Sequence, residues 1–416
     1  MKQDYKIHII GAGVSGLIAA QVLEANGYHP VIMEATDRVG GRVKTDIINS
    51  YQLDHGFQVL LTAYPAAQKF LDLDALELQH FLPGATVFNQ GKKRTLGDPL
   101  RNVSLLFPTL MSGIGTISDK LKIFKLNRLL KKTSLTTIFS KPEKNTLQYL
   151  VDFGFTDEII SLFFKPFFSG IFLEPELQTS SRMFEFIYKM FGEGFAALPK
   201  AGIEAIPKQL KSKLKHTTFH FNTNVQVVND GKITLSNGAE IESHFTIIAT
   251  EPSAIVANLK NQETRWKSCD TLYFETDNKL IDKPLIGLIA DQDTLINNIF
   301  YHTSLSLHSV GEKQLVSVTV VKDHELSKEA LTAQIQKELN QYCGLNSCSL
   351  LQHYTIPRAL PQLDNIHYEM LPSETRLTTS IFLAGDTQLN GSLNAAMISG
   401  ERAALGVIET VTNTIV

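Results

Sequence analysis

The clearest pattern of apolar and polar positions lies in the first 42 residues of the chain. Residues 6–10 are a short run rich in isoleucine, and residues 30–33 are a second apolar run. Between them, residues 17–26 carry apolar side chains at helical spacing. The pattern predicts a strand, a helix and a second strand, the unit from which doubly wound α/β sheets are built.

The turn between the first strand and the helix has the glycine spacing of a phosphate-binding turn. Gly11 allows the tight turn, Gly13 lets the backbone approach a pyrophosphate, and Gly16 lets helix and strand pack closely. The helix start, at Val14 and Ser15, offers N–H groups and a partial positive charge to phosphate oxygens. An ordinary glycine turn is the alternative, and the flanking strands and helix argue against it.

An acid follows the second strand. Glu34 stands where a carboxylate can accept hydrogen bonds from a ribose diol. Together with the glycine turn, it predicts a dinucleotide site.

The segment after Glu34 resembles the flavin amine oxidase, phytoene desaturase and protoporphyrinogen oxidase superfamily, whose members follow the ribose acid with R-x-G-G-R. After Ala35, this chain matches the segment at Arg38, Gly40, Gly41 and Arg42. Paired glycines allow a second close pass of the backbone, and a guanidinium can neutralise pyrophosphate oxygens. The resemblance implies FAD rather than a nicotinamide cofactor.

The C-terminal segment resembles the same superfamily. There a strand ending in Gly-Asp, here Gly385 and Asp386, meets the pyrophosphate or ribityl chain. The following helix meets the pyrimidine edge of the flavin with its first residues, here Leu393 and Asn394. Asn394 departs from the glycine common in relatives.

The resemblance implies further contacts in the middle of the chain. Relatives bring a residue pair ending in glycine past the flavin ring, which makes His55, Gly56 and Phe57 candidates. Val225 corresponds to backbone contacts with the adenine. Two catalytic candidates, His55 and Lys267, stay open: a histidine beside a glycine turn is often structural, and Lys267 is either the lysine that amine oxidases place near the flavin or a surface lysine.

Composition limits the class of protein. With 416 residues, 43% of them hydrophobic and 19% charged, the chain is long enough for two globular domains. The net charge of −3 argues against nucleic acid as a general partner. Three cysteines suit neither a disulfide framework nor a metal site, and residues 1–5 are too short and polar for a signal peptide. We therefore expect a cytoplasmic protein without a metal.

Residues 100–141 depart from this composition. They contain eight Lys or Arg and one acid among many apolar side chains. Such a segment either lies in a membrane interface or forms a solvated cationic helix over an ordinary core. The first alternative places the protein on the cytoplasmic face of a membrane, as a peripheral contact.

Aromatic residues concentrate just beyond this segment. Residues 153–195 hold eleven of the 24 phenylalanines. They either line an apolar substrate tunnel or form core, and as a group they favour an apolar substrate over a sugar.

These features predict a doubly wound, Rossmann-type FAD-binding domain with an inserted α+β substrate domain. The expected FAD domain comprises residues 1–62, 195–260 and 353–416, and the substrate domain comprises residues 63–194 and 261–352.

Four functions stay open. The first is a dehydrogenase or desaturase of an apolar polyene, isoprenoid or tetrapyrrole-like substrate. The others are a peroxide-producing amine oxidase, a non-redox isomerase or mutase, and a protein whose FAD is structural. The sequence leaves the electron acceptor and the oligomeric state open.

Overall fold

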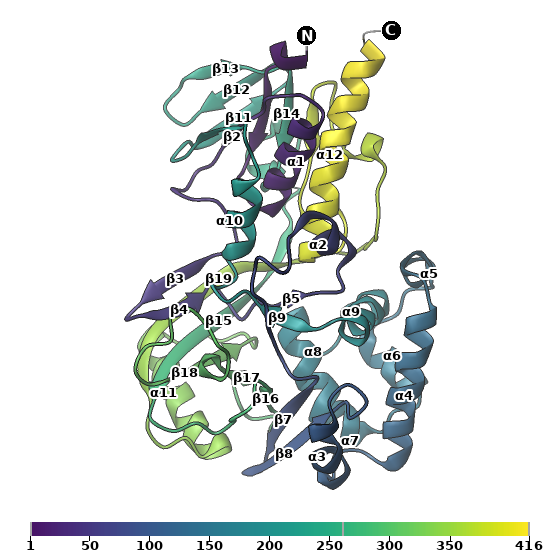
Figure 1. Ribbon diagram of the computed structural model, residues 1–416, viewed down its shortest axis with the longest axis vertical. Helices are drawn as coiled ribbons and strands as arrows, with labels where there is room; N and C mark the ends of the chain where they lie inside the picture. Colours follow the sequence, from purple (N-terminus) through teal and green to yellow (C-terminus); the bar gives the residue numbers. More distant parts are fainter. Residues whose placement is uncertain (1, 260–261, 415–416) are drawn as a thin grey trace.

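A five-stranded parallel sheet forms the end of the molecule that carries both termini (Figure 1). The computed structural model describes residues 2–259 and 262–414. Strands from five separate parts of the chain make up this sheet, all parallel to their neighbours. Their order is β10 (Thr218–His220), β2 (Val31–Met33), β1 (Ile7–Ile10), β14 (Phe245–Ile248) and β20 (Ile381–Leu383).

The central strand shows why a parallel sheet forms here. All four residues of β1 are buried, as expected for a strand covered on both faces. Ile7 and Ile9 face helices α1 (Val14–Ala25) and α12 (Leu393–Thr414), while Ile10 faces a three-stranded antiparallel sheet. That small sheet consists of β11 (Val225–Asn229), β12 (Lys232–Leu235) and β13 (Glu240–Glu242). The structure thus confirms the predicted doubly wound fold.

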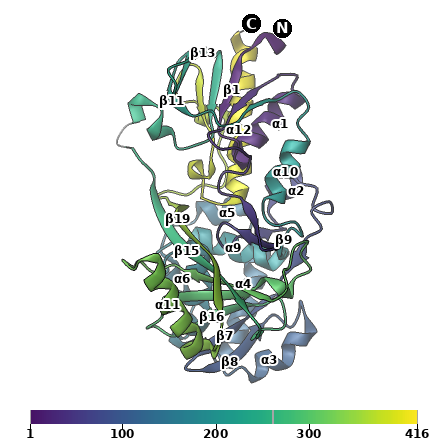
Figure 2. The same cartoon turned by 90° about the vertical axis from the view of Figure 1, so that its left-hand side faces the viewer.

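The opposite end of the molecule holds a larger mixed sheet (Figures 1 and 2). Adjacent strands in this sheet are antiparallel, except for the parallel pair β16–β7. Helix α11 (Lys328–Glu338) packs on one face through Leu331 and Ile335. The strands run in the order β19 (Ser349–Gln362), β15 (Arg265–Thr276), β18 (Gln314–Val320), β17 (Ile296–Tyr301), β16 (Ile286–Ile289), β7 (Gly84–Asn89) and β8 (Lys92–Gly97).

A group of helices lies beside this mixed sheet, and we call it the helical lobe (Figure 1). Several phenylalanines there are fully buried and contact one another, with ring centroids of Phe168 and Phe184 4.7 Å apart. Those phenylalanines are core, the second alternative of the sequence analysis. The helices are α3 (Leu106–Met111), α4 (Ile117–Lys132), α5 (Leu135–Ser140), α6 (Thr146–Asp152), α7 (Asp157–Ile159), α8 (Lys165–Phe172) and α9 (Ser181–Glu193).

Short elements connect the two ends. A hairpin, a small three-stranded sheet and two helices lie between the parallel sheet and the mixed sheet (Figure 1). They are β3 (Thr45–Ile48), β4 (Tyr51–Asp54), β5 (Leu60–Leu61), β6 (Gln79–His80), β9 (Ala196–Leu198), α2 (Pro65–Phe70) and α10 (Ala205–Ser212).

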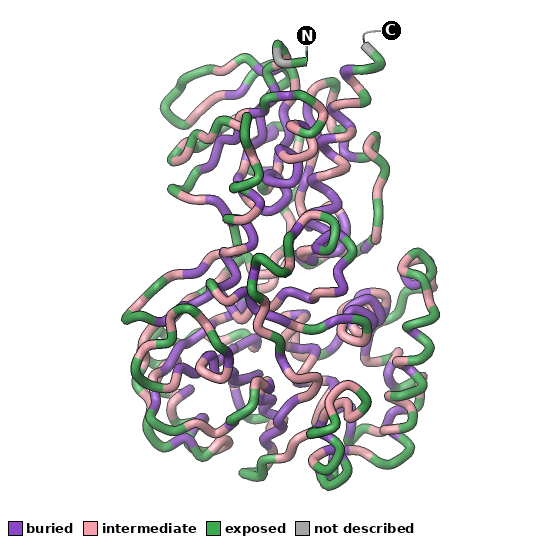
Figure 3. The backbone as a smooth tube through the Cα atoms, viewed as in Figure 1, coloured by how far each residue is buried: buried purple, intermediate pink, exposed green. Residues whose placement is uncertain are grey.

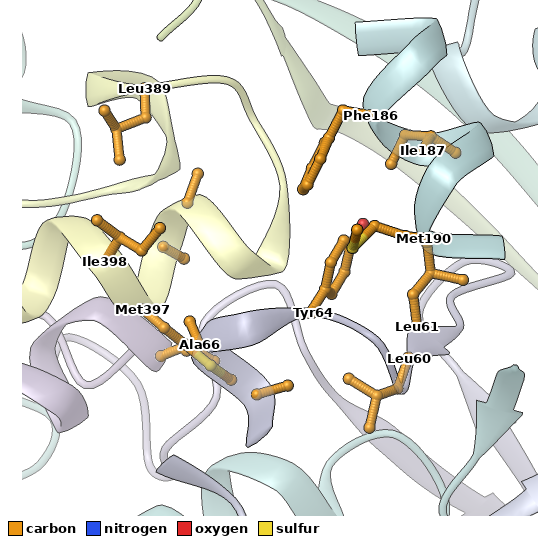
Figure 4. Close-up of a cluster of buried hydrophobic side chains, with 14 of the residues drawn as sticks. Leu60, Leu61, Tyr64, Ala66, Phe186, Ile187, Met190, Leu389, Met397 and Ile398 are labelled. Carbon is orange, nitrogen blue, oxygen red and sulfur yellow. The ribbon is translucent and has the colours of Figure 1, made fainter. Parts of the chain in front are cut away.

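An apolar cluster joins the C-terminal helix to the helical lobe. Tyr64 and Phe186 stack with ring centroids 5.7 Å apart, and Figure 4 shows Met397 of α12 beside Ala66 of α2. Buried residues of α12, α2 and α9 accordingly belong to one hydrophobic cluster, and Figure 3 colours the buried residues of the molecule purple.

Two of the predicted domain boundaries can be compared with the described residues. The division between residues 260 and 261 lies outside the described residues. The division before residue 353 falls inside β19, whose whole length pairs with β15 in the mixed sheet. Within the described ranges, no helix is long and apolar enough to cross a membrane.

The contact between α1 and α12 leads to a prediction about stability. A Cβ on Gly400 of α12 would overlap the backbone oxygen of Ser15 in α1. Gly→Ala normally stabilises a helix interior by about 1 kcal/mol, but here overpacking should reverse the sign and destabilise by about 1–3 kcal/mol. Thermal unfolding of Gly400→Ala should therefore show a lowered midpoint.

Gly192→Ala is the matched control. Gly192 also lies in a helix, α9, but its added Cβ would come no nearer than 3.6 Å to Asn127 Oδ1. Its midpoint should stay the same or rise. Equal behaviour of the two variants would contradict the close helix contact.

Candidate functional site

The start of α1 forms an open cradle. Gly13 caps the helix without any side-chain hydrogen bond, and a Cβ placed on it would meet nothing within 4 Å. The second glycine turn approaches from the side: Gly13 forms a β-bridge with Gly40, and a Cβ on Gly41 would lie 3.3 Å from Gly13 Cα. Gly41 has a φ of +60°, which suits glycine. The two predicted glycine turns therefore meet at one point.

The other residues of the first turn hold the backbone in place. A Cβ added to Gly11 would lie 2.9 Å from Ala249 O, and a Cβ added to Gly16 would lie 3.2 Å from Ile9 Cγ2. Val14 and Ser15 are buried in the first turn of the helix. These residues bring strand and helix together, whereas the free space lies at Gly13.

Glu34 lies beside the cradle, at the end of β2. Its Oε2 accepts the Ala12 N–H at 2.8 Å, and its Oε1 accepts the N–H and hydroxyl of Thr36 at 2.9 and 2.8 Å. A carboxylate can accept about four hydrogen bonds, so one further donor can bind. Ala35, between Glu34 and Thr36 in the chain, is exposed.

Val225, the residue for which the resemblance predicts contact with the adenine, lies near the end of β2. Val225 is buried at the start of β11 and packs in one cluster with Ile10 and Met33. The preceding Thr223 donates its N–H to Glu34 O at 2.9 Å. The structure thus brings Val225 next to the end of β2.

The C-terminal segment reaches the same region. Asp386 forms an ion pair with Arg42, whose guanidinium lies 5.0 Å from the Trp266 ring centroid. Gly385 has a φ of +144° and donates its N–H to Ser399 Oγ at 2.9 Å. The sequence analysis did not single out Trp266, although it is the only tryptophan in the chain.

The first residues of α12 turn toward α2. Leu393 is partly buried, and Asn394 is completely buried, with its Oδ1 accepting the Ala66 N–H at 3.0 Å. Where relatives have glycine, this chain thus uses a carboxamide to join two of its own helices. Leu393 and Asn394 remain predicted flavin contacts.

Arg38 has partners within the protein. Its Nη2 lies 2.7 Å from Asp46 Oδ1, and its Nε lies 3.4 Å from Glu204 Oε1. Two carboxylates therefore share the guanidinium that was expected to face pyrophosphate oxygens. The sequence analysis did not identify Asp46 or Glu204.

His55 belongs to the same polar network. Its Nε2 lies 2.7 Å from Asp46 Oδ2, and its ring stacks on Tyr354 with centroids 4.5 Å apart. Tyr354 also donates its hydroxyl to Asp46 Oδ2 at 2.9 Å. Burial acts to raise the pKa of Asp46, but the hydrogen bonds from Arg38, His55 and Tyr354 outweigh it and lower that pKa to about 2. His55 is thus hydrogen-bonded and oriented.

Phe57 faces the mixed sheet. Gly56 turns the chain with a φ of +94°, and the Phe57 ring lies 5.3 Å from Phe300 and 6.0 Å from Phe81, centroid to centroid. His302, 6.4 Å from Phe57, is buried and bonded to Ser317. Burial lowers the pKa of His302 to about 3, so the imidazole is neutral at pH 7.

Lys267 does not have the environment of a surface lysine. Its Nζ donates to Phe172 O at 2.9 Å and to Thr179 Oγ1 at 3.1 Å, both in the helical lobe. Burial lowers the pKa of its ammonium group. The side chain is partly buried, and this cation joins β15 to the segment that follows α8.

The geometry fits the cofactor expected from the sequence. An uncapped helix start with open space at Gly13 suits a pyrophosphate, and Glu34 with one remaining acceptor position suits a ribose. The ion pair of Arg42 with Asp386 joins the two ends of the chain at this site.

The open space at Gly13 can be tested directly. Its φ of −71° is accessible to alanine, so Gly13→Ala should fold with an unchanged unfolding midpoint in the absence of FAD. The methyl group would occupy the space above the helix start and should weaken FAD binding at least about tenfold. Fluorescence titration of the apoprotein with FAD measures this affinity. Undiminished FAD affinity would show that the cradle lies elsewhere.

Asp54 should make stability depend on pH. Burial is the largest effect on this carboxyl and raises its pKa to about 6, against the hydrogen bonds from Thr45 Oγ1 at 2.6 Å and Ile203 N at 3.1 Å. The folded protein holds this proton more tightly than the unfolded chain does. The contribution of Asp54 to the free energy of unfolding is therefore fully present below about pH 4 and is lost as the pH rises through about 6.

Asp54→Asn should remove this part of the pH dependence. Both hydrogen bonds go to Oδ1, which asparagine retains. Urea unfolding between pH 4 and pH 7 should show a flatter stability profile for the variant than for the wild type. Parallel profiles would contradict the assignment.

Comparisons with known proteins agree with this geometry. The profile of the flavin-containing amine oxidoreductase family matches residues 14–408. An L-amino-acid oxidase from Sistrurus catenatus edwardsii is 29% identical over 157 residues, 36% of this chain and 30% of that protein. Protoporphyrinogen oxidase 2 from Arabidopsis thaliana is 29% identical over 172 residues, 40% of this chain and 32% of that protein. The alignments thus span about a third of the length of these relatives.

Solved structures share the whole fold. A fatty acid isomerase from P. acnes that produces CLA superposes with a TM-score of 0.69 over 100% of both chains, at 14% identity. At that identity the likeness shows the fold alone. Since the family profile covers almost the whole chain, including the second glycine turn and the C-terminal Gly-Asp pair, the chain belongs to the flavin-containing amine oxidoreductase family and takes a flavin cofactor.

Proposed function

We propose that the protein is an FAD-dependent dehydrogenase or desaturase that acts on an apolar polyene, isoprenoid or tetrapyrrole-like substrate. A flavin, when bound, supplies a hydride acceptor. The observation that carries the proposal is the aromatic, uncharged surrounding of Phe57, directly after the turn expected to pass the flavin ring.

The geometry described above supports the proposed binding roles. In the proposal, the helix start at Gly13 and the turn at Gly41 hold the pyrophosphate through main-chain N–H groups, and Glu34 holds the ribose. The proposed FAD domain comprises residues 1–62, residues 195–260 and the chain after β19, because β19 pairs within the mixed sheet; the remaining residues form the proposed substrate domain. The three free cysteines support a place in the cytoplasm.

The surroundings of Phe57 favour an uncharged substrate. Phe81 and Phe300 are apolar, and His302 is neutral at pH 7. A substrate ammonium in this position would lose its hydration without gaining a carboxylate partner from these residues, which is unfavourable. A conjugated hydrocarbon or macrocycle would instead gain ring contacts and apolar burial.

The position of Lys267 also favours an uncharged substrate over an amine. The ammonium of Lys267 is bonded to Phe172 O and Thr179 Oγ1. In the proposal this group fixes the helical lobe against β15 and takes no part in amine oxidation. His55, held by Asp46 and Tyr354, orients the turn before Gly56.

Anaerobic reduction of the flavin tests the proposal. The FAD-loaded protein should lose its visible flavin absorbance with a polyene, an isoprenoid or a porphyrinogen, and should keep it with amines and amino acids. Phe57→Ala should slow this reduction at least about tenfold, because it removes the ring against which the substrate packs. Phe219→Ala is the control, since Phe219 stacks on Phe221 at the edge of the parallel sheet.

Two other outcomes would replace the proposal. Peroxide released with an amine or amino acid would identify an oxidase, as the similarity to the L-amino-acid oxidase allows. Conversion of a substrate to an isomer without net oxidation would identify an isomerase, the activity named for the P. acnes structure.

A further inference from the structure

Exposed large apolar side chains concentrate in one part of the helical lobe. Of the sixteen large apolar side chains that are exposed among residues 2–259 and 262–414, ten lie between residues 100 and 129. Large contiguous apolar patches are uncommon on monomeric proteins and mark binding surfaces. The ten are Leu100, Val103, Leu106, Phe107, Leu110, Met111, Ile117, Leu121, Phe124 and Leu129, which we call the apolar surface.

Helix α4 shows that the core does not need these residues. Leu126 and Leu130 on one side of the helix are buried in the main core. Ile117, Leu121 and Phe124, spaced four and three residues apart, form a second stripe on the opposite side. They are 79%, 65% and 50% exposed. The helix therefore has two apolar faces, of which the protein covers one.

The preceding segment continues the exposed stripe. Phe107 and Met111 lie four residues apart on α3 and are 77% and 83% exposed, while Leu105 just before them is buried against the mixed sheet. Figure 1 places α3 at the end of the helical lobe that is farthest from α1 and α4 along the outer edge of the lobe, and Figure 3 colours many residues in both places as exposed.

Cations border the stripe. Lys125, Arg128, Lys131 and Lys132 are all exposed on α4, at positions that flank Ile117, Leu121 and Phe124. In the part of the chain that the structure describes, no carboxylate lies within ion-pair distance of these four. Lys141, by contrast, pairs with Glu185 at 2.7 Å. The four cations are therefore available to an external anion.

We propose that this surface docks on an anionic lipid bilayer, with the apolar stripe in the acyl boundary and the four cations at the headgroups. Exposed apolar residues flanked by Lys and Arg are the pattern of helices that lie in a membrane interface. A second copy of the chain fits less well, because two such surfaces would bring the same four positive charges together. The proposal does not depend on which substrate the flavin oxidises.

Vesicle sedimentation tests the docking. The full FAD-loaded protein should pellet with vesicles of phosphatidylcholine and phosphatidylglycerol at low salt, and much less with pure phosphatidylcholine or in 0.5 M salt. The charge variant Lys125→Gln, Arg128→Gln, Lys131→Gln, Lys132→Gln should bind on the order of a hundredfold more weakly. The apolar variant Phe107→Ser, Met111→Ser, Phe124→Ser should lose at least about tenfold.

The control variant carries the same kind of change elsewhere. Ile47, Val310 and Leu371 are exposed apolar residues outside the apolar surface, and their replacement by serine should leave vesicle binding unchanged. Flavin content and unfolding midpoints verify that all variants fold. Wild-type protein that stays in the supernatant with anionic vesicles, or surface variants that pellet like the wild type, would overturn the proposal. A wild-type dimer that only the apolar variant dissociates, without vesicle binding, would also overturn it.

Discussion

The structure depends on backbones that approach each other without intervening side chains. α12 crosses α1 where Gly400 meets the backbone of Ser15, and the second glycine turn meets the first where Gly40 bridges Gly13. Close packing at these points is what allows segments from both ends of the chain to converge on one helix start. The ion pair of Arg42 with Asp386 and the apolar cluster around Tyr64 then hold the C-terminal helix in place.

Much of the parallel-sheet end could be predicted from the sequence. The positions of β1, α1 and β2 follow from apolar periodicity, and the roles of Gly11, Gly13 and Gly16 follow from backbone geometry that few other residues allow. The second glycine turn and the C-terminal Gly-Asp pair carried the family resemblance, which the family profile confirms.

Side-chain partners were harder to predict, because they depend on distant parts of the chain. Asp46 meets Tyr354, which lies 308 residues further on, and nothing in local spacing indicates that contact. The environment of Lys267 likewise depends on Phe172 and Thr179 in another lobe. In α4, Leu121 and Leu126 are the same residue type in one helix, so only the packed structure distinguishes the exposed side chain from the buried one.

The order of strands in the parallel sheet also bears on how the protein is made. β20 and α12 follow the other described strands and helices in the chain and leave the ribosome after them, yet β20 pairs with β14 and α12 covers α1. Until they emerge, the apolar side of α1 has no permanent cover, while every strand of the mixed sheet, β19 included, has already been synthesised. Completion of the nucleotide-binding half is therefore a long-range event during biosynthesis, and cofactor uptake can stabilise the chain only after the mixed sheet, β20 and α12 have all been synthesised.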